Sequence, residues 1–176
     1  ALADKSLAGI SETMAQVMAK SEPASLEAVD LGAMCDDIVV LLDPLRNHSV
    51  TYPRLRIEAD QTAVQIILRN LIDNALKHVD ATSVRVDVAV TQVNARRLAL
   101  CVRDHGPGFE ADVDAAGDTD VPVEGGYGLR GVRRLVKARG GTVTIAQPTD
   151  GTGTEVRVEL PGRILSEAPQ QARAVC

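Results

Sequence analysis

Hydrophobic periodicity changes in the middle of this chain, from the spacing of a helix to the alternation of strands. Between Gln61 and His78 apolar residues recur at steps of three and four, which predicts an amphipathic helix with Asp60 as its N-cap. Residues 84–90 and 98–102 then alternate apolar and polar side chains, which predicts two strands joined by a hairpin turn at 92–96. A helix followed by half-buried strands restricts the chain to folds in which helices cover a sheet.

The flanking segments extend this pattern. They predict a helix at 30–43, an edge strand at 50–57, and, after a long acidic segment at 110–126, a helix at 129–138 and strands at 142–146 and 155–160. Asp30 is a suitable N-cap, and Gly140-Gly141 is a suitable C-cap. An aperiodic segment of this length predicts a functional loop such as a lid. The expected fold is α+β: a two-layer α/β sandwich with a mixed, mostly antiparallel sheet and helices on one face.

Length and charge limit the possible functions. The 176 residues suit one domain with short appendages, which we place at 1–27 (end of a helix and a linker), 28–162 (the domain) and 163–176 (a polar tail). The chain starts at Ala1, so a fragment of a longer protein is expected. A net charge of −5 and only 2% aromatic residues argue against nucleic-acid binding. We expect no membrane contact by this fragment, and three widely spaced cysteines favour a reducing, cytoplasmic location.

One side of the central helix carries polar residues suited to a metal–phosphate group. Asn70, Asn74, Lys77 and His78 share that side, opposite the apolar face. An asparagine carbonyl can donate oxygen to Mg²⁺, and a lysine ammonium can neutralise phosphate oxygens. The alternative is that these residues form an ordinary solvated helix face. Without the other motifs, the pattern of this helix favours that alternative over a ligand site.

Two glycine-containing motifs follow. Asp104-x-Gly106-x-Gly108 comes at the end of a predicted strand, where glycines let the backbone approach a flat ligand and a carboxylate can accept a hydrogen bond from an exocyclic amine. Asp-x-Gly also occurs in ordinary turns. Residues 125–131, Gly-Gly-Tyr-Gly-Leu-Arg-Gly, open the next helix and expose amide hydrogens suited to an anion. A dinucleotide fingerprint is a poor alternative, because its glycines should directly follow a strand.

Together and in this order, the motifs resemble the N box and the two glycine boxes of the GHKL ATPases. The most similar members are the catalytic, ATP-binding domains of bacterial sensor histidine kinases, and the resemblance covers about residues 56–161. It rests on four segments: Leu-Arg-Asn-Leu-Ile-Asp-Asn-Ala-Leu-Lys-His (68–78), Val-Arg-Asp-His-Gly-Pro-Gly-Phe (102–109), Tyr-Gly-Leu-Arg (127–130) and Gly-Thr-Glu-Val-Arg-Val-Glu-Leu-Pro (153–161).

The resemblance implies roles for the matching residues. Asn74 would coordinate Mg²⁺ with Asn70 beside it, and Lys77 would contact phosphate, so that these three form the catalytic group. Asp104 would accept a hydrogen bond from the adenine amine of ATP. Other residues would line the nucleotide: His78, Gly106, Gly108 and Thr154, and, near the phosphates, Gly126, Tyr127, Gly128 and Leu129, with backbone amides of Gly126, Gly128 and Leu129 placed there as the lid closes.

Some residues depart from the family pattern. Glu124 places a negative charge where the second glycine box often has a glycine, and Phe109 is the only phenylalanine, so the usual Phe-rich box is missing. His105 lies between Asp104 and Gly106, where the family tolerates variety, and is expected to be structural or exposed.

The implied function is that of a catalytic domain in a two-component sensor histidine kinase. It would bind Mg-ATP and transfer the γ-phosphoryl group to a histidine on a dimerisation domain of the same parent protein, for relay to an aspartate of a response-regulator receiver domain. None of His48, His78 and His105 is followed by an acidic residue as an acceptor histidine would be, so this chain is expected to lack its own acceptor. The parent is expected to be a homodimer, with or without a membrane anchor. Two alternatives stay open: a GHKL anti-sigma factor with serine-kinase activity, and a nucleotide-free adaptor that binds a receiver domain.

Overall fold

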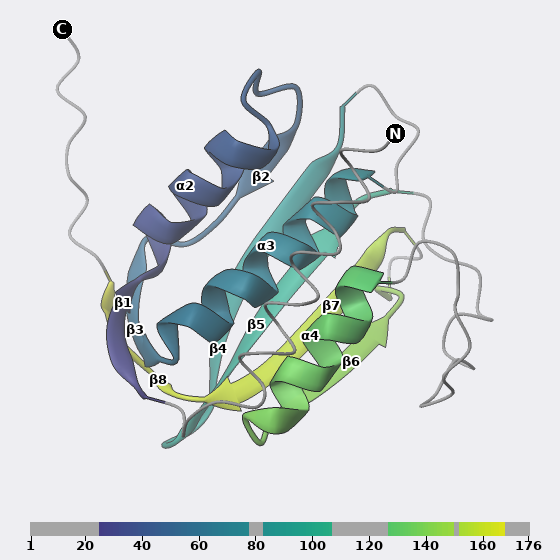
Figure 1. Cartoon of the computed structure of the whole chain (residues 1–176). Coiled ribbons are helices and arrows are strands. Elements are labelled where there is room, and N and C mark those ends of the chain that lie inside the picture. Colours follow the sequence, from purple (N-terminus) through teal and green to yellow (C-terminus); the bar gives the residue numbers. More distant parts are fainter. Residues whose placement is uncertain (1–24, 78–82, 107–126, 150–151, 168–176) are drawn as a thin grey trace, which may run out of the picture.

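The chain folds into a layer of helices on a layer of strands (Figure 1). The computed structural model describes residues 25–77, 83–106, 127–149 and 152–167. The elements in chain order are β1 (Glu27–Asp30), α2 (Leu31–Leu42), β2 (Ser49–Thr51), β3 (Leu55–Ala59), α3 (Gln61–Lys77), β4 (Arg85–Asn94), β5 (Arg97–Asp104), α4 (Tyr127–Ala138), β6 (Thr142–Ala146), β7 (Thr154–Pro161) and β8 (Arg163–Glu167).

The strands form two sheets. The larger has the order β2-β4-β5-β7-β6, and the smaller has the order β1-β3-β8. Among the described strands, β2 and β4 pair in parallel and the other neighbours pair antiparallel. The predicted class, a mixed and mostly antiparallel sheet with helices on one face, is therefore confirmed. The division into two sheets is a feature that the strand pattern does not predict.

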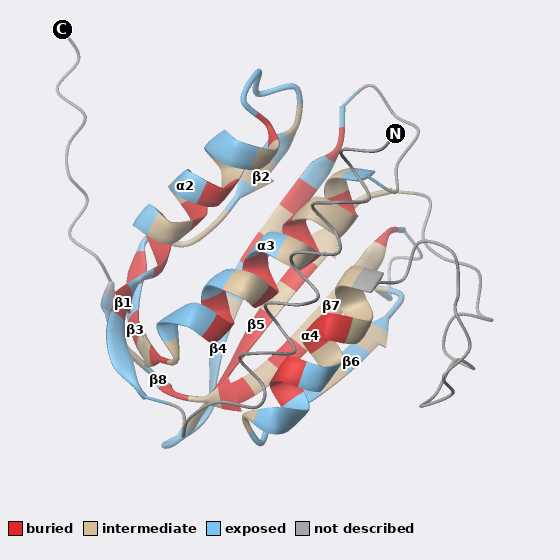
Figure 2. Ribbon diagram, in the orientation of Figure 1, coloured by how far each residue is buried: buried red, intermediate tan, exposed pale blue. Residues whose placement is uncertain are grey.

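The core lies between the helices and the strands. α3 packs on β4 and β5, and α4 packs on β6 and β7. Figure 2 shows buried segments along both helices and along the strands that they cover. The largest fully buried side chains include Ile67, Leu68, Ile72, Leu98, Leu100 and Leu135. Each contributes roughly 1.5–3 kcal/mol by leaving water. No helix in the described ranges is long and apolar enough to cross a membrane.

The helix ends follow the predicted capping. Asp60 precedes α3, and its Oδ1 accepts a hydrogen bond from the backbone N–H of Ala63 at 2.9 Å. Asp30 caps α2 in the same way, with Ala33 as the donor at 2.9 Å. α4 ends before Gly140, which has a φ of 69°, a conformation that glycine adopts without steric cost. The predictions for these three helices are confirmed to within a few residues.

The segment predicted as one edge strand at 50–57 is instead two strands in different sheets. β2 belongs to the five-stranded sheet and β3 to the three-stranded sheet. Pro53 lies between them, and its ring removes the backbone donor that a continuous strand would need. The prediction missed that the proline divides the segment.

Two further predictions are corrected. The hairpin turn is shorter than 92–96, because β4 continues to Asn94 and β5 begins at Arg97. Residues 163–167, predicted as the start of a polar tail, form β8 and pair with β3, where Ile164 packs against the core. A long-range strand partner stabilises β8, and the local sequence pattern does not reveal it. Residues 1–24, which include the predicted end of a helix, the acidic segment at 110–126 and residues 168–176 lie outside the described residues.

Candidate functional site

α3 presents two half-buried asparagine side chains, one turn apart. Nδ2 of Asn70 donates a hydrogen bond to the backbone carbonyl of Ile66 at 2.7 Å. This bond fixes the amide plane and turns Oδ1 away from the backbone of its own helix. Asn74 lies on the same side of the helix, because residues four apart are neighbours on a helix surface.

The first turn of α4 lies directly against these two amides. A Cβ atom placed on Gly128 would lie 3.2 Å from Oδ1 of Asn70 and 3.4 Å from Oδ1 of Asn74. Any side chain at this position would push the nearer amide away by a few tenths of an ångström, so glycine allows the closest approach of these oxygens to α4. The structure therefore brings the asparagine motif and the second glycine motif together, although 54 positions separate Asn74 from Gly128 in the sequence.

Lys77, at the end of α3, points its ammonium at Asp73, one turn earlier. Nζ lies 2.8 Å from Oδ2 of Asp73, and the lysine side chain is 58% exposed. An exposed pair of this kind contributes only about 0.3–0.5 kcal/mol. The ammonium can therefore leave Asp73 for a stronger anion at little cost.

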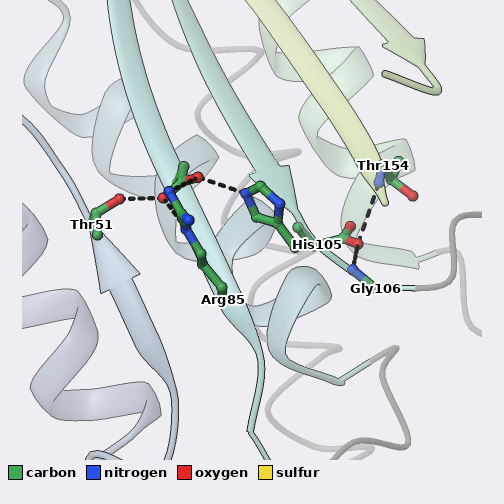
Figure 3. Close-up of polar contacts among 7 residues, drawn as sticks. Thr51, Arg85, His105, Gly106 and Thr154 are labelled. Atoms are coloured by element: carbon green, nitrogen blue, oxygen red, sulfur yellow. Dashed lines mark hydrogen bonds and ion pairs between the residues drawn. The ribbon is translucent and has the colours of Figure 1, made fainter. Parts of the chain in front are cut away.

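The carboxylate of Asp104 is held at the end of β5 by two backbone donors. Oδ1 accepts hydrogen bonds from the N–H of Gly106 at 3.0 Å and from the N–H of Thr154 at 3.3 Å (Figure 3). Within the described part of the chain no group donates to Oδ2. Oδ2 is thus an oriented acceptor that can take a hydrogen bond from a ligand.

The close approach of β7 to Asp104 requires a glycine. Gly153 has a φ of 78°, and a Cβ atom there would lie 1.8 Å from the backbone oxygen of Asp104. Thr154 follows it and pairs with Asp104 across the two strands. In this structure the backbone N–H of Thr154 donates to the Asp104 carboxylate, and its predicted place beside the adenine stays a prediction.

Strand register places the Asp104 side chain on the helix side of the sheet. Asp104 pairs with Val86 of β4, and directly opposite residues in an antiparallel pair share a face. Val86 is fully buried in the core beneath the helices. Figure 1 shows the end of α3, the end of β5 and the start of α4 at the same end of the sandwich. The described residues of the three predicted motifs therefore lie at one end of the sandwich.

A second carboxylate, that of Asp87, has contacts with side chains from β2, from β4 and from the residue after β5. Asp87 of β4 accepts hydrogen bonds from the hydroxyl of Thr51 and from Nε of Arg85 at 3.2 Å. Nε2 of His105 lies 2.6 Å from Oδ2 of Asp87, and both side chains are 27% exposed. His105, predicted to be structural or exposed, is thus half-buried and paired. Sequence reasoning missed Asp87, because its partners meet only once the strand register is set.

The Asp87 cluster should give a pH-dependent contribution to stability. Burial alone would raise the pKa of Asp87, but hydrogen bonds from Thr51, His105 and Arg85 outweigh it and lower the pKa to about 2. Because the folded pKa lies below the unfolded one, the stabilisation is complete above about pH 4 and is lost as the pH falls toward 2. The shift corresponds to about 2 kcal/mol. In urea unfolding, the difference between the wild type and Asp87→Asn should shrink by roughly two thirds of that amount between pH 6 and pH 2.5, because pH 2.5 still lies above the folded pKa. A constant difference would contradict this assignment.

Several predicted residues lie outside the described residues: His78, Gly108 and Gly126. Tyr127 is the first residue of α4, and Leu129 packs against the core at its partly buried position. The described site therefore consists of the asparagines and Lys77 of α3, Gly128 and Leu129 of α4, and Asp104, Gly106 and Thr154.

The donor set suits Mg²⁺ bound together with phosphate. No group of three His, Cys, Asp or Glu residues that could hold a metal occurs in the described residues. The oxygens that border the bare backbone of Gly128 are instead neutral amides, from Asn70 and Asn74. Mg²⁺ is usually held by one or two protein oxygens, with water and substrate phosphate completing its coordination. Two amide oxygens fit this pattern.

The sandwich and the site together define an ATPase domain of the GHKL class. The chain belongs to the family of histidine kinase-, DNA gyrase B- and HSP90-like ATPases, whose family model matches residues 59–164, more than half of the chain. The resemblance seen in the sequence is therefore confirmed at the level of the family.

Within this family, the relatives and the solved structure to which the chain is similar are sensor kinases. A sensor-like histidine kinase of Rhizobium meliloti is 36% identical over 126 residues, covering 65% of this chain and 23% of the relative. The sensor protein kinase CarS of Pseudomonas aeruginosa is 33% identical over 154 residues, covering 84% of this chain and 33% of the relative. The solved structure of the mycobacterial sensor histidine kinase MprB matches with a TM-score of 0.60 and 25% identity, over 80% of this chain and 99% of that structure. The chain thus spans about a quarter to a third of the length of these two sequence relatives.

Proposed function

We propose that this chain is the ATP-binding catalytic domain of a two-component sensor histidine kinase. It binds Mg-ATP and supplies the γ-phosphoryl group to a histidine on a dimerisation domain of the same parent, from which the phosphate passes to a receiver-domain aspartate. The observation that carries the proposal is the close approach of α4, at Gly128, to the amide oxygens of Asn70 and Asn74, which leaves room for little more than a hydrogen atom at that position. The relatives named above are sensor kinases, which favours this function over an anti-sigma factor or an adaptor.

In the proposed site, each residue has a distinct task. Asn74 holds Mg²⁺ with Asn70 beside it, and the metal, when bound, neutralises charge on the phosphates. Lys77 exchanges its contact with Asp73 for a phosphate oxygen. Transfer of the γ-phosphoryl group depends mainly on the positioning of the reacting groups and on neutralisation of the phosphate charge.

At the other end of the nucleotide, Asp104 accepts a hydrogen bond from the adenine amine through Oδ2, while Oδ1 stays on its two backbone donors. Gly106 and Thr154 border the base, and Gly128 and Leu129 present backbone amides to the phosphates. We assign His78, Gly108, Gly126 and Tyr127 to the same site on the resemblance alone.

We place the ATP-binding unit at residues 27–167, since β1 and β8 complete its smaller sheet. The residues before it are assigned to the end of a dimerisation-domain helix and a linker. We further propose that the domain acts in the cytoplasm within a homodimeric parent, where ATP and receiver domains are present.

Asp104→Asn should remove adenine recognition selectively. The asparagine can keep an oxygen on the two backbone donors, but its Nδ2 then faces the amine, donor against donor. We expect the Kd of ADP to rise by about 10-fold to 100-fold, the range for a lost hydrogen bond to a charged group. Inosine diphosphate has a carbonyl in place of the amine, so the variant should bind it at least as tightly as the wild type does. Calorimetry with both nucleotides in the presence of Mg²⁺ measures this; an equal loss for both would contradict the role of Asp104.

Gly128→Ala should weaken nucleotide binding without weakening the fold. The added methyl group would press on the amide of Asn70 at 3.2 Å and displace it by a few tenths of an ångström. We expect the Kd of ADP with Mg²⁺ to rise by about 10-fold, since displaced metal and phosphate groups lose their alignment. The free energy of unfolding should not fall, because alanine favours a helix over glycine by about 1 kcal/mol. Unchanged affinity would show that these amides do not take part in binding.

A further inference from the structure

His105 directly follows the candidate adenine acceptor and is anchored twice to the neighbouring strand. Its backbone N–H donates to the carbonyl oxygen of Arg85 at 3.1 Å. Its ring nitrogen Nε2 lies 2.6 Å from Oδ2 of Asp87. These contacts hold the residue that leaves β5 against β4 through both its main chain and its side chain.

Asp87 is itself a fixed partner rather than a mobile surface carboxylate. It accepts from the hydroxyl of Thr51 on the adjacent strand β2 and from the guanidinium of Arg85. Figure 3 shows the contacts of Thr51, Arg85 and His105 next to those of Gly106 and Thr154. The cluster thus joins β2, β4 and the end of β5.

The ring of His105 and the carboxylate of Asp104 lie on opposite faces of the sheet. Asp104 pairs with Val86 on the helix side, whereas Asp87, the next residue of β4, points to the other face, as alternation along a strand requires. His105 contacts Asp87, so its ring lies on the face opposite to the one that α3 and α4 cover. It therefore cannot serve as a ligand for a base that Asp104 contacts, and any effect on binding must pass through the backbone.

The Asp104 carboxylate depends on the backbone that His105 anchors. Its Oδ1 is held by the N–H of Gly106, on the far side of His105 in the chain, and by that of Thr154. If His105 moves, the Gly106 donor moves with it, and Oδ2 loses its direction.

We propose that His105 and Asp87 form a positioning pair, which fixes the end of β5 from the face opposite to α3 and α4 and thereby aims the Asp104 carboxylate at the adenine amine. The proposal rests on the nucleotide site proposed above and adds a specificity determinant outside it. The pair acts through geometry and not through contact with the nucleotide.

The first test needs no nucleotide. In NMR hydrogen exchange, His105→Ala should speed exchange of the Gly106 and Thr154 amides by about 10-fold, while amides in the middle of α3 keep their protection. His105→Gln, whose side-chain amide can still donate to Asp87, should restore most of the protection. Unchanged exchange at both amides in His105→Ala would overturn the positioning role, whether or not the domain binds ATP.

The second test measures adenine specificity in the full chain. Calorimetry with Mg²⁺ gives the Kd of ADP and that of inosine diphosphate for each variant. His105→Ala should raise the Kd of ADP by about 10-fold and leave that of inosine diphosphate unchanged, and it should add nothing in an Asp104→Asn background. Asp87→Asn should have the same selectivity with a smaller effect. Glu159→Gln removes a carboxylate that accepts from Arg157 on the same sheet face, and should change neither Kd. An equal loss for both nucleotides, or full additivity with Asp104→Asn, would overturn the proposal; failure of the wild type to bind ADP would instead contradict the proposed function.

Discussion

Replacing Asn74 by alanine should abolish Mg²⁺-dependent nucleotide binding. The substitution removes an amide oxygen that lies beside the backbone of Gly128, where metal and phosphates would meet in the proposed site. Loss of a metal ligand costs more than loss of a supporting group, so we expect the Kd of ATP with Mg²⁺ to rise by at least about 100-fold. Calorimetric titration with ATP, in the presence of Mg²⁺ and again with a chelator, measures the effect.

Asn47→Ala is the matched control for this variant. Asn47 is an exposed asparagine in the turn after α2 and belongs to none of the three site motifs, so its replacement should leave the Kd unchanged. In the presence of chelator, the wild type and Asn74→Ala should bind with similar, weak affinity, because the metal contact is then absent from both. If Asn74→Ala binds Mg-ATP as tightly as the wild type, Asn74 is not a metal ligand.

Asp60→Ala, at the N-cap of α3, should lower stability more than any single substitution of a polar residue within α3. Oδ1 of Asp60 caps the helix through Ala63, and Oδ2 accepts from Nε of Arg139, beyond α4, at 2.7 Å. The side chains of Arg139 and Asp60 are only 8% and 15% exposed. Breaking a buried ion pair and losing a cap together should lower the free energy of unfolding by about 3 kcal/mol or more. Urea unfolding followed by circular dichroism measures this.

Two further variants separate the contribution of the N-cap from that of the ion pair with Arg139. Asp60→Asn keeps a good N-cap but removes the charge opposite Arg139, so its cost should be smaller than that of alanine. Asp73→Ala removes the partner of the exposed Lys77 on the same helix and should cost no more than about 0.5 kcal/mol. A cost for Asp60→Ala as small as that for Asp73→Ala would show that the link between α3 and α4 does not stabilise the domain.

Local patterns predicted the helices well, because their determinants lie within each segment. The apolar stripe and the Asp60 cap gave α3 nearly its observed bounds, Gln61–Lys77. Strands that depend on distant partners were not predictable in this way. β1 and β8 are short and are defined by pairing with β3, so neither stands out in the sequence.

In the candidate site, too, the residues in local motifs were predictable and the contacts between distant segments were not. Asn70, Asn74 and Asp104 were recognised because each belongs to a motif with fixed spacing, and the structure adds that α4, at Gly128, closely approaches the two amides. The link between His105 and Asp87 could not be predicted, because two side chains 18 positions apart meet only through the register of β4 and β5. A strand residue such as Asp87 has the same local pattern whether it is solvated or anchored.

An NMR titration of the domain with ADP and Mg²⁺ would decide whether the asparagine helix and the end of β5 bind one nucleotide. The side-chain amide of Asn74 and the backbone amides of Gly106 and Thr154 should shift together, with a single shared Kd. If the amides near Asp104 respond while Asn74 does not, or if the two groups saturate at different ADP concentrations, there is no common nucleotide site.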